Sequence, residues 1–315
     1  MNIRQFRYTD LESVIHIAKI SFAEEYVARG ETPEGFAKQV RMVAKGRMLP
    51  FKLLTAFSGL KWKLFVAEVD GKIVGFGSYL GRTQMELANL MVHPKYRRQG
   101  IGQALLEKRL EHLREQGYPF ATTTILASNQ ASLGNVKKQG FEVFDQFTIW
   151  EKSLSQEVKT AEYKNKLLAL PFQSSDKAVF KELEKQIVDP AYLQIQGSAL
   201  PLYFPSLGGR LMNRFAATQR WIRAFSKDGS TLGFLLAETS IGQNKGTIGR
   251  PLVLDKHIDY LAPMLHEATA WLNGLNKTAI QLSVPINRVS IIEKLQNSGW
   301  IKTQSWVRLI KKLAS

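Results

Sequence analysis

The chain has 315 residues, 44% of them hydrophobic and 22% charged, which is the balance of a soluble globular protein with one large or two ordinary domains. The absence of cysteine excludes a disulfide framework, a thiolate nucleophile and a cysteine-based zinc site, and it fits a reducing cytoplasm. The formal net charge of +16 divides into +7 through Lys152 and +9 after it, so the charge is spread along the chain and favours anionic ligands, lipids or polymers.

The first half of the chain alternates short apolar runs with amphipathic segments, a pattern that predicts mixed strands and helices. Asp70-Gly71 lies between two apolar runs and predicts a hairpin turn. The predicted elements are a strand at 2–8, a helix at 11–18 capped by Thr9 or Asp10, a helix near 34–45, strands at 64–67, 73–77, 85–92 and 121–127, a helix from 101, a helix from Asn129 to Gly140, and strands at 141–144 and 146–150.

The most informative stretch runs from Leu90 to Gln103. Leu90, Met91 and Val92 end a buried strand, and Pro94 stops it because proline cannot donate to a sheet ladder. A basic turn with two glycines follows, and it opens an amphipathic helix. The free N–H groups and positive dipole end of a helix N-terminus attract anions, and glycine lets a phosphate approach closely. The stretch therefore predicts a phosphate site, although its spacing is neither that of the P-loop nor that of the dinucleotide fingerprint.

Arg97-x-x-Gly100-x-Gly102, preceded by Leu90-x-Val92-x-Pro94, resembles the acyl-coenzyme A pyrophosphate loop of the GNAT superfamily of N-acetyltransferases. Asn129, followed after a helix by Gly140-Phe141, resembles the second cofactor segment of that superfamily. The resemblance covers residues 2–152. It implies an α/β (α+β) fold: a mixed, mostly antiparallel twisted sheet, flanked by helices, whose fourth and fifth strands splay apart. It also implies acetyl-coenzyme A, or another acyl-coenzyme A, as co-substrate and no metal.

The resemblance also implies roles for individual residues. The backbone of Leu90, Met91 and Val92 would face the pantetheine arm and the thioester carbonyl, and Asn129 would hold the arm. The pyrophosphate would lie on the turn and helix start formed by Arg97, Arg98, Gln99, Gly100, Ile101, Gly102 and Gln103.

The catalytic groups are less well defined by the resemblance. Glu86 is placed like the catalytic glutamate of some members, and the alternative is a solvent-facing strand residue. His93 could relay a proton, or could simply belong to the turn before Pro94. Val136 stands where many members carry a proton-donating tyrosine, so no general acid is expected there. A coenzyme A thiol is acidic enough to leave without one.

The second half of the chain repeats the first. Asp228-Gly229 and the apolar run after it repeat Asp70-Gly71 at an offset of 158, Asn287 follows Asn129 by 158, and Gly299-Trp300 follows Gly140-Phe141 by 159. A near-constant offset across separate elements indicates an internal duplication. We predict two tandem GNAT-like units, at 1–152 and 164–315, joined by a polar linker at 153–163.

The second unit is expected to lack a phosphate site. The position of its loop, 255–263, has no glycine and carries Asp255 and Asp259, whose charges would repel a pyrophosphate. We therefore expect this unit to complete the acceptor cleft or to stabilise the first one.

The predicted function is direct transfer of an acyl group to the amine of a small molecule or peptide. Two alternatives stay open: a non-catalytic acyl-coenzyme A sensor or scaffold, and a transferase peripheral to an anionic membrane surface. The second alternative rests on segments 35–67 and 190–227, where basic and aromatic residues alternate and no acidic residue occurs. The simpler interpretation is that their apolar residues pack between units. No motif indicates nucleic-acid binding, and none identifies the acceptor or the oligomeric state.

Overall fold

The computed structural model describes residues 1–21, 34–35, 41, 59, 61–154, 167–215, 217–240 and 243–313. The chain forms two compact units, one made of Met1–Asp145 with Trp306–Ser315 and the other of Gln146–Ser305. Most of the helix predicted near 34–45 and of the linker predicted at 153–163 lies outside the described residues. No helix in the described part of the chain combines the length and the hydropathy of a membrane span.

The first unit contains a sheet with the strand order β1-β2-β3-β4-β5-β13, antiparallel throughout except for the parallel pair β4–β5. Its elements are β1 Asn2–Gln5, η1 Tyr8–Asp10, α1 Leu11–Ser21, β2 Lys61–Val69, β3 Lys72–Gly81, β4 Met85–Val92, η2 Pro94–Tyr96, α5 Ile101–Glu115, β5 Phe120–Leu126, α6 Gln130–Lys138, the start of β6 Glu142–Ser153 and the end of β13 Ile301–Lys312. The predicted edge strand, hairpin and β4 are confirmed.

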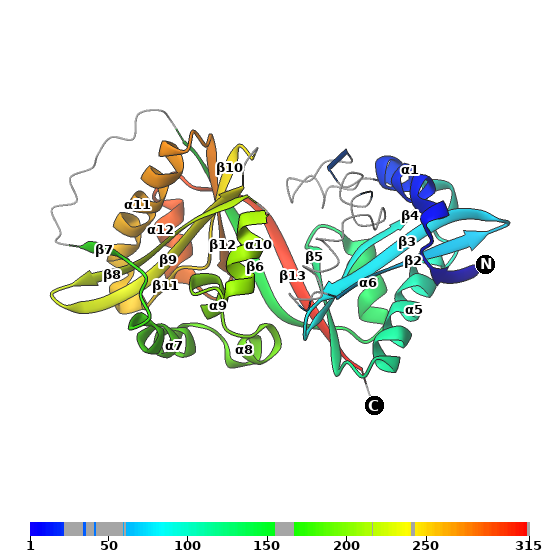
Figure 1. The fold of residues 1–315 in the computed structure, drawn as a ribbon, viewed down its shortest axis with the longest axis horizontal. Coiled ribbons are helices and arrows are strands. Elements are labelled where there is room, and N and C mark those ends of the chain that lie inside the picture. The colour runs from blue at the N-terminus through cyan, green and yellow to red at the C-terminus, as the bar shows by residue number, and fades with distance from the viewer. Residues whose placement is uncertain are drawn as a thin grey trace. The chain divides into compact units, whose positions relative to one another are not determined.

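Helices cover both faces of this sheet (Figure 1). Helix α1 packs on Leu64 and Val66 of β2, while α5 packs on Phe65 and Ala67 of the same strand. Successive side chains of a strand point to opposite faces, so a strand that is buried on both sides reads as a continuous apolar run. This explains why Leu64 to Ala67 shows no polar alternation.

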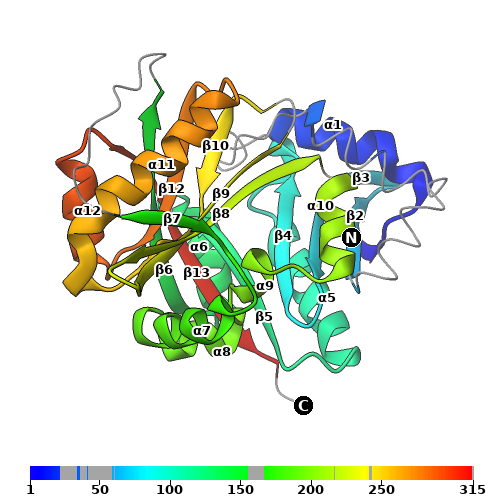
Figure 2. The same ribbon diagram turned by 60° about the vertical axis from the view of Figure 1, so that its left-hand side comes forward.

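The second unit has the strand order β6-β12-β10-β9-β8-β7, with β11 pairing with β9. Helices α11 and α7 lie on opposite sides of β8 and β9 (Figure 2). Its further elements are β7 Leu168–Pro171, α7 Asp176–Ile187, α8 Pro190–Gln196, α9 Leu200–Tyr203, α10 Leu207–Phe215, β8 Thr218–Lys227, β9 Ser230–Ser240, β10 Lys245–Ile248, β11 Leu252–Val253, η3 Asp255–Tyr260, α11 Leu261–Gly274, β12 Ala279–Pro285 and α12 Val289–Gln296.

Local geometry repeats between the two units. The hairpin turns at Asp70 and Asp228 both have a φ of 49°, in the left-handed region that two-residue hairpin turns require. Asp10 and Asp176 each accept a 2.7 Å hydrogen bond from the backbone N–H three residues earlier. Asp10 therefore braces the turn before α1 instead of capping that helix as predicted. Burial alone would raise the pKa of Asp10, but hydrogen bonds from Arg4 and from that backbone N–H lower it.

The last strand of each repeat belongs to the sheet of the other unit. The prediction of separate strands at 141–144 and 146–150 is wrong, because β6 runs unbroken from Glu142 to Ser153. Its residues 147–153 pair antiparallel with β12, and residues 306–312 of β13 pair antiparallel with β5. The two pairings are equivalent, since Ser153 faces Ala279 and Lys312 faces Phe120. The sheet of the first unit is thus completed by β13, the last strand of the second repeat, and the sheet of the second unit by β6, the last strand of the first repeat.

The strand exchange predicts that a substitution near the C-terminus will destabilise the N-terminal unit. Leu309 of β13 is fully buried in the core around α5. Leu309→Ala should lower the stability of the first unit by about 2–5 kcal/mol, the usual range for a large-to-small change in a core. Hydrogen exchange followed by mass spectrometry should show faster exchange in β5 and unchanged exchange in β12.

The control for this experiment is Leu282→Ala in β12, where the side chain is also fully buried but belongs to the second unit. Leu282→Ala should accelerate hydrogen exchange in β12 and leave it unchanged in β5. If Leu309→Ala accelerated hydrogen exchange in β12 and not in β5, the assignment of β13 to the first unit would be contradicted.

Candidate functional site

A gap opens between β4 and β5. The two strands pair only over Met85–Leu87 and Ala121–Thr123, although both continue beyond these residues. At the end of the pairing the hydroxyl of Thr123 donates to the Leu87 carbonyl at 3.1 Å. Beyond this point lies a cavity of about 370 Å³, a size within the range of small-molecule sites. The predicted splayed strand pair is confirmed.

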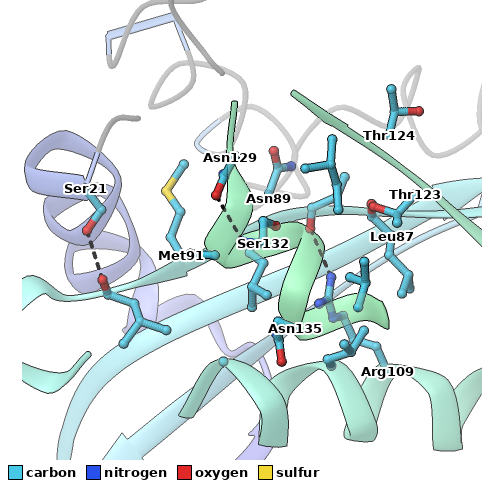
Figure 3. A pocket seen from close by; sticks show the side chains of 18 of the residues that line it. Ser21, Leu87, Asn89, Met91, Arg109, Thr123, Thr124, Asn129, Ser132 and Asn135 are labelled. Carbon is cyan, nitrogen blue, oxygen red and sulfur yellow. Dashed lines mark hydrogen bonds between the residues drawn. The ribbon is translucent and has the colours of Figure 1, made fainter. Parts of the chain in front are cut away.

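The cavity is lined by both strands, by the end of α1, by the turn before α5, and by α5 and α6 (Figure 3). Two arginines contribute positive charge, and carboxamide and hydroxyl groups supply most of the remaining polarity. No carboxylate or imidazole belongs to the described residues that line it. These residues are Ser21, Leu87, Ala88, Asn89, Leu90, Met91, Val92, Arg97, Gly102, Leu106, Arg109, Thr123, Thr124, Ile125, Asn129, Ala131, Ser132, Asn135 and Val136.

The predicted site residues fall into two groups. Leu90, Met91, Val92, Arg97, Gly102 and Asn129 line the cavity. Arg98, Gln99, Gly100, Ile101 and Gln103 lie in the same turn and helix start but do not line it.

The turn after β4 presents a helix N-terminus to the cavity. Helix α5 begins at Ile101, so the N–H groups of its first turn have no carbonyl of the same helix to bind. Arg97 donates from Nε to the Val92 carbonyl at 3.2 Å, which fixes the start of the turn. Arg98 and Gly100 have φ angles of 64° and 77°, and these left-handed residues turn the chain from the strand into the helix. The turn thus has the form of an anion site.

The two glycines of the turn have different roles. Gly100 needs its positive φ, so any side chain there would strain the backbone. Gly102 is helical, and an ideal Cβ on it would lie 3.9 Å from both Asn135 and Val92. That contact is relaxed, so a side chain at Gly102 would project into the cavity without straining the backbone. Gly102 keeps this part of the wall open.

Helix α6 supplies the opposite wall. Asn129 is its N-cap and accepts a 3.0 Å hydrogen bond from the N–H of Ser132. This gives the residue a structural role that is independent of any ligand. Val136 lines the cavity and is buried in the core around α5, so this position presents only methyl groups and no proton donor, as its sequence implies.

The predicted catalytic candidates lie outside the cavity lining. Glu86 lies on β4 opposite Leu80 of β3 and Thr122 of β5, before the strands part. His93 follows β4 as the N-cap of η2, and its Nδ1 accepts from the N–H of Lys95 at 3.2 Å, as a turn residue would.

Sequence reasoning missed a bulge in β4. Asn89 has a φ of 54°, and the pairing with β3 shifts there. Asparagine tolerates left-handed geometry better than most residues, so an Asn inside an apolar strand was the available signal. Arg109 and Ser21 were missed as well, because a polar residue within a helix is ordinarily placed toward solvent.

The second unit differs at the corresponding place. Register with β9 makes Leu252 and Val253 the equivalents of Met91 and Val92, which places Pro251 at the position of Leu90. Proline has no N–H to offer.

An arginine also crosses this position in the second unit. The buried Arg288, at the N-terminus of α12, donates to the Val253 carbonyl at 2.6 Å and pairs with Asp255 at 3.4 Å. Burial lowers the pKa of Arg288, while Asp255 favours its charged form. Arg288 thus ties α12 to the carbonyl of Val253, the equivalent of the cavity-lining Val92 of the first unit.

The segments with alternating basic and aromatic residues can be placed only in part. Segment 35–67 lies largely outside the described residues. Within 190–227, Arg220 forms a 2.8 Å ion pair across the β8–β9 hairpin, and the guanidinium of Arg223 lies 5.0 Å from the ring centre of the buried Trp221. These two cations therefore have partners inside their own unit.

Comparisons with known proteins agree with this geometry. Residues 46–141 match the model of the acetyltransferase (GNAT) family. Over 91 residues the chain is 30% identical to the ribosomal protein bS18-alanine N-acetyltransferase of Escherichia coli K12, a match that covers 29% of this chain and 62% of that protein. The chain spans less than two thirds of the length of the curated relatives it matches.

Two solved structures are similar over the whole chain. A tandem GNAT protein from the clavulanic acid biosynthesis pathway has a TM-score of 0.64 at 15% identity, covering 100% of this chain and 99% of that one. A GCN5-related N-acetyltransferase from Sphaerobacter thermophilus has a TM-score of 0.65 at 18% identity, covering 100% and 96%. Identities this low bear on the fold alone. Residues 46–141 are thus similar to the GNAT family, and the whole chain has the fold of tandem GNAT proteins, as the resemblance predicted.

The N-cap geometry gives a prediction that separates the two roles of Asn129. Asn129→Ala should lower the free energy of unfolding of the first unit by about 1 kcal/mol, because the cap of α6 is lost. Asn129→Ser keeps a capping oxygen and should stay within a few tenths of the parent. Urea denaturation followed by circular dichroism measures both values. Equal losses for the two variants would show that the cap does not stabilise α6.

Proposed function

We propose that the first unit binds acetyl-coenzyme A, or another acyl-coenzyme A, and transfers its acyl group directly to an amine. The observation that carries the proposal is the cavity between β4 and β5, which leads to the basic, glycine-containing turn at the start of α5. A pantetheine arm fits a strand gap of this kind, and a pyrophosphate fits a helix N-terminus. The match of residues 46–141 to the GNAT family model supports the same assignment.

Acyl transfer breaks the thioester C–S bond and forms a C–N bond, and the attacking amine loses a proton. A neutral amine is needed, because a protonated amine has no lone pair. The described lining supplies hydrogen-bond donors for the carbonyl but neither a carboxylate nor an imidazole as base. The leaving thiolate needs no proton donor at neutral pH. We infer that the site works mainly by holding the two reactants together.

One cofactor per chain is the proposed stoichiometry. In the second unit Pro251 stands at the position of Leu90, and Arg288 crosses the place of the cavity. Asp255 and Asp259 lie in the 3₁₀ segment where a phosphate turn would be, and their charges oppose a pyrophosphate.

The acceptor is proposed only as a class, the amine of a small molecule or peptide. The name of the Escherichia coli relative specifies the alanine of a ribosomal protein. A peptide with an N-terminal alanine therefore belongs in the first acceptor panel, beside polyamines, amino sugars and lysine peptides.

A non-catalytic acyl-coenzyme A sensor is the second candidate function. The apolar Val136 in the cavity wall favours it, since the proton donor of many family members is missing. Release of free thiol in the presence of the acceptor panel decides between the two. Cofactor binding without thiol release above the rate of uncatalysed hydrolysis would support the sensor.

Gly102→Glu should weaken the affinity for acetyl-coenzyme A at least tenfold, or about 1.4 kcal/mol, because it places a carboxylate beside the pyrophosphate without straining the backbone. Gly208→Glu is the matched control, since Gly208 is the second residue of α10 in the second unit and has open space around its Cβ. Isothermal titration calorimetry measures both affinities. Failure of the unmodified protein to bind any acyl-coenzyme A would refute both candidate functions.

The pH dependence should follow the acceptor and not the protein. Without a base in the cavity, kcat/KM should rise tenfold per pH unit up to the pKa of each amine, near 7.7–8.0 for a peptide α-amine and near 10.4 for lysine. Peptide α-amines should then react far faster than lysines at pH 7. Rates with a fixed saturating level of acetyl-coenzyme A test this. A plateau at one shared pH for different amines would instead indicate a base on the protein, such as Glu86.

A further inference from the structure

The bulge in β4 decides which residues face the cavity. Phe76 of β3 pairs with Met91, and Ser78 pairs with Ala88, so the two residues Asn89 and Leu90 stand opposite the single residue Gly77. A bulge of this kind leaves one backbone N–H outside the ladder and bends the strand. Both bulge residues form part of the cavity wall.

The bulge also reverses the alternation of side chains along β4. Before it, Met85 and Leu87 pack in the core around α5. After it, Leu90 and Val92 pack against that same core, while Met91 packs against α1. Strict alternation from Leu87 would have placed Met91 on the side of α5. The shape of the strand beside the cavity therefore depends on the bulge remaining in place.

Polar side chains fasten the bulge to β3. The hydroxyl of the fully buried Ser78 donates to the Ala88 carbonyl at 3.3 Å, and the carboxamide of Asn89 donates to that hydroxyl at 3.2 Å. These bonds lie at the position where the regular ladder between the two strands is interrupted.

Arg109 of α5 contacts the bulge region from the face of the sheet that α5 covers (Figure 3). Its side chain is only 2% exposed. Nη1 donates to the Ser78 carbonyl at 2.9 Å and to the Ala88 carbonyl at 3.2 Å, while Nε donates to the Leu105 carbonyl at 3.1 Å. The guanidinium lies directly under Gly77, because an ideal Cβ on that glycine would come within 3.0 Å of its Cζ.

An arginine in this place requires an explanation beyond packing. Its neighbours on the buried stripe of α5 are Leu105, Leu106, Leu110 and Leu113. A leucine or methionine would fill the position without desolvating a charge, and a buried charge is unfavourable unless hydrogen bonds satisfy it. The carbonyls that receive these bonds are those of Ser78 and Ala88, the residue pair next to the bulge.

We propose that Arg109 is a positioning residue, which holds the bulge of β4 so that its backbone N–H faces the acyl carbonyl in the cavity. The part of this inference that concerns the acyl group rests on the proposed function. The part that concerns the bulge does not, since every contact in it lies within the ligand-free protein.

The first test uses protein without ligand. Arg109→Met keeps an unbranched apolar stem at this position and removes the hydrogen bonds of the guanidinium. Amide exchange measured by mass spectrometry should accelerate at least tenfold in the peptide covering 85–92. Leu113→Ala serves as control, because Leu113 is fully buried on the same helix, one turn beyond Arg109, and does not line the cavity. The two variants are compared at temperatures equally far below their melting temperatures. If the amide exchange rate in 85–92 were then the same in Arg109→Met as in Leu113→Ala, the proposal would be overturned.

The second test measures catalysis by the folded fraction. Arg109→Met should lower kcat at least tenfold, because removing one preorganised donor to a developing oxyanion costs on the order of a hundredfold in rate. The affinity for coenzyme A without an acyl group should change less than threefold, since the hydrogen bonds of Arg109 to Ser78, Ala88 and Leu105 lie outside the pyrophosphate turn. Arg109→Lys should recover part of kcat. An unchanged kcat in Arg109→Met would remove the catalytic part of the proposal.

Gly77→Ala provides an independent variant. It leaves every hydrogen-bonding group in place but pushes a methyl group against the guanidinium. It should shift kcat and amide exchange in the same direction as Arg109→Met, by a smaller factor. If the parent binds no acyl-coenzyme A, the proposed function fails while the exchange experiment still decides the role of Arg109.

Discussion

The structure of the candidate site depends on one constraint in β4. The strand must pair with β5 up to Leu87, separate from it afterwards, and remain packed between helices on both faces. A regular strand cannot meet all three demands, because pairing and side-chain direction are fixed together by the pleat. The bulge at Asn89 and Leu90 meets them by adding a residue on the side of β4 that faces β3. The cavity follows from that addition.

The duplication shows which features a site needs and which belong to the fold. Both units keep the hairpin turn, the glycine after the last helix, and the equivalent pairing of the exchanged strand. Among the described residues, only the first has a glycine-containing turn at its helix start and an N–H at the position of Leu90. The second has Pro251 at that position, and its Arg288 binds the carbonyl of Val253, the equivalent of Val92. The features shared by the units are therefore architectural, and those confined to the first mark the site.

Much of the fold was predictable because its signals are local. Asp-Gly turns, the Pro94 strand stop and the amphipathic helices act within a few residues. The strand exchange was not predictable, since residues 146–153 carry the same pattern whichever sheet they join. Nor could the sequence predict which side chains of β4 point to which face of the sheet. Met85–Val92 is largely apolar and covered on both faces, so polar residues do not mark a solvent side. Arg109 was hidden for a related reason: sequence alone cannot tell a buried arginine with carbonyl partners from an exposed one.

The charge of the cavity also bears on which ligands it favours and on the protonation state of an amine that enters it. Arg97 and Arg109 line it, and none of the described lining residues is acidic. A positive, partly enclosed wall attracts a polyanionic cofactor and repels a protonated amine, and both effects are stronger than in bulk water because the local dielectric is lower. In the proposed reaction, the same electrostatics that would favour the acyl donor would select for an acceptor that has already lost its proton. Because Val136 presents only methyl groups, the cavity would act by bringing the reactants together, and proton transfer would fall to the acceptor and the solvent.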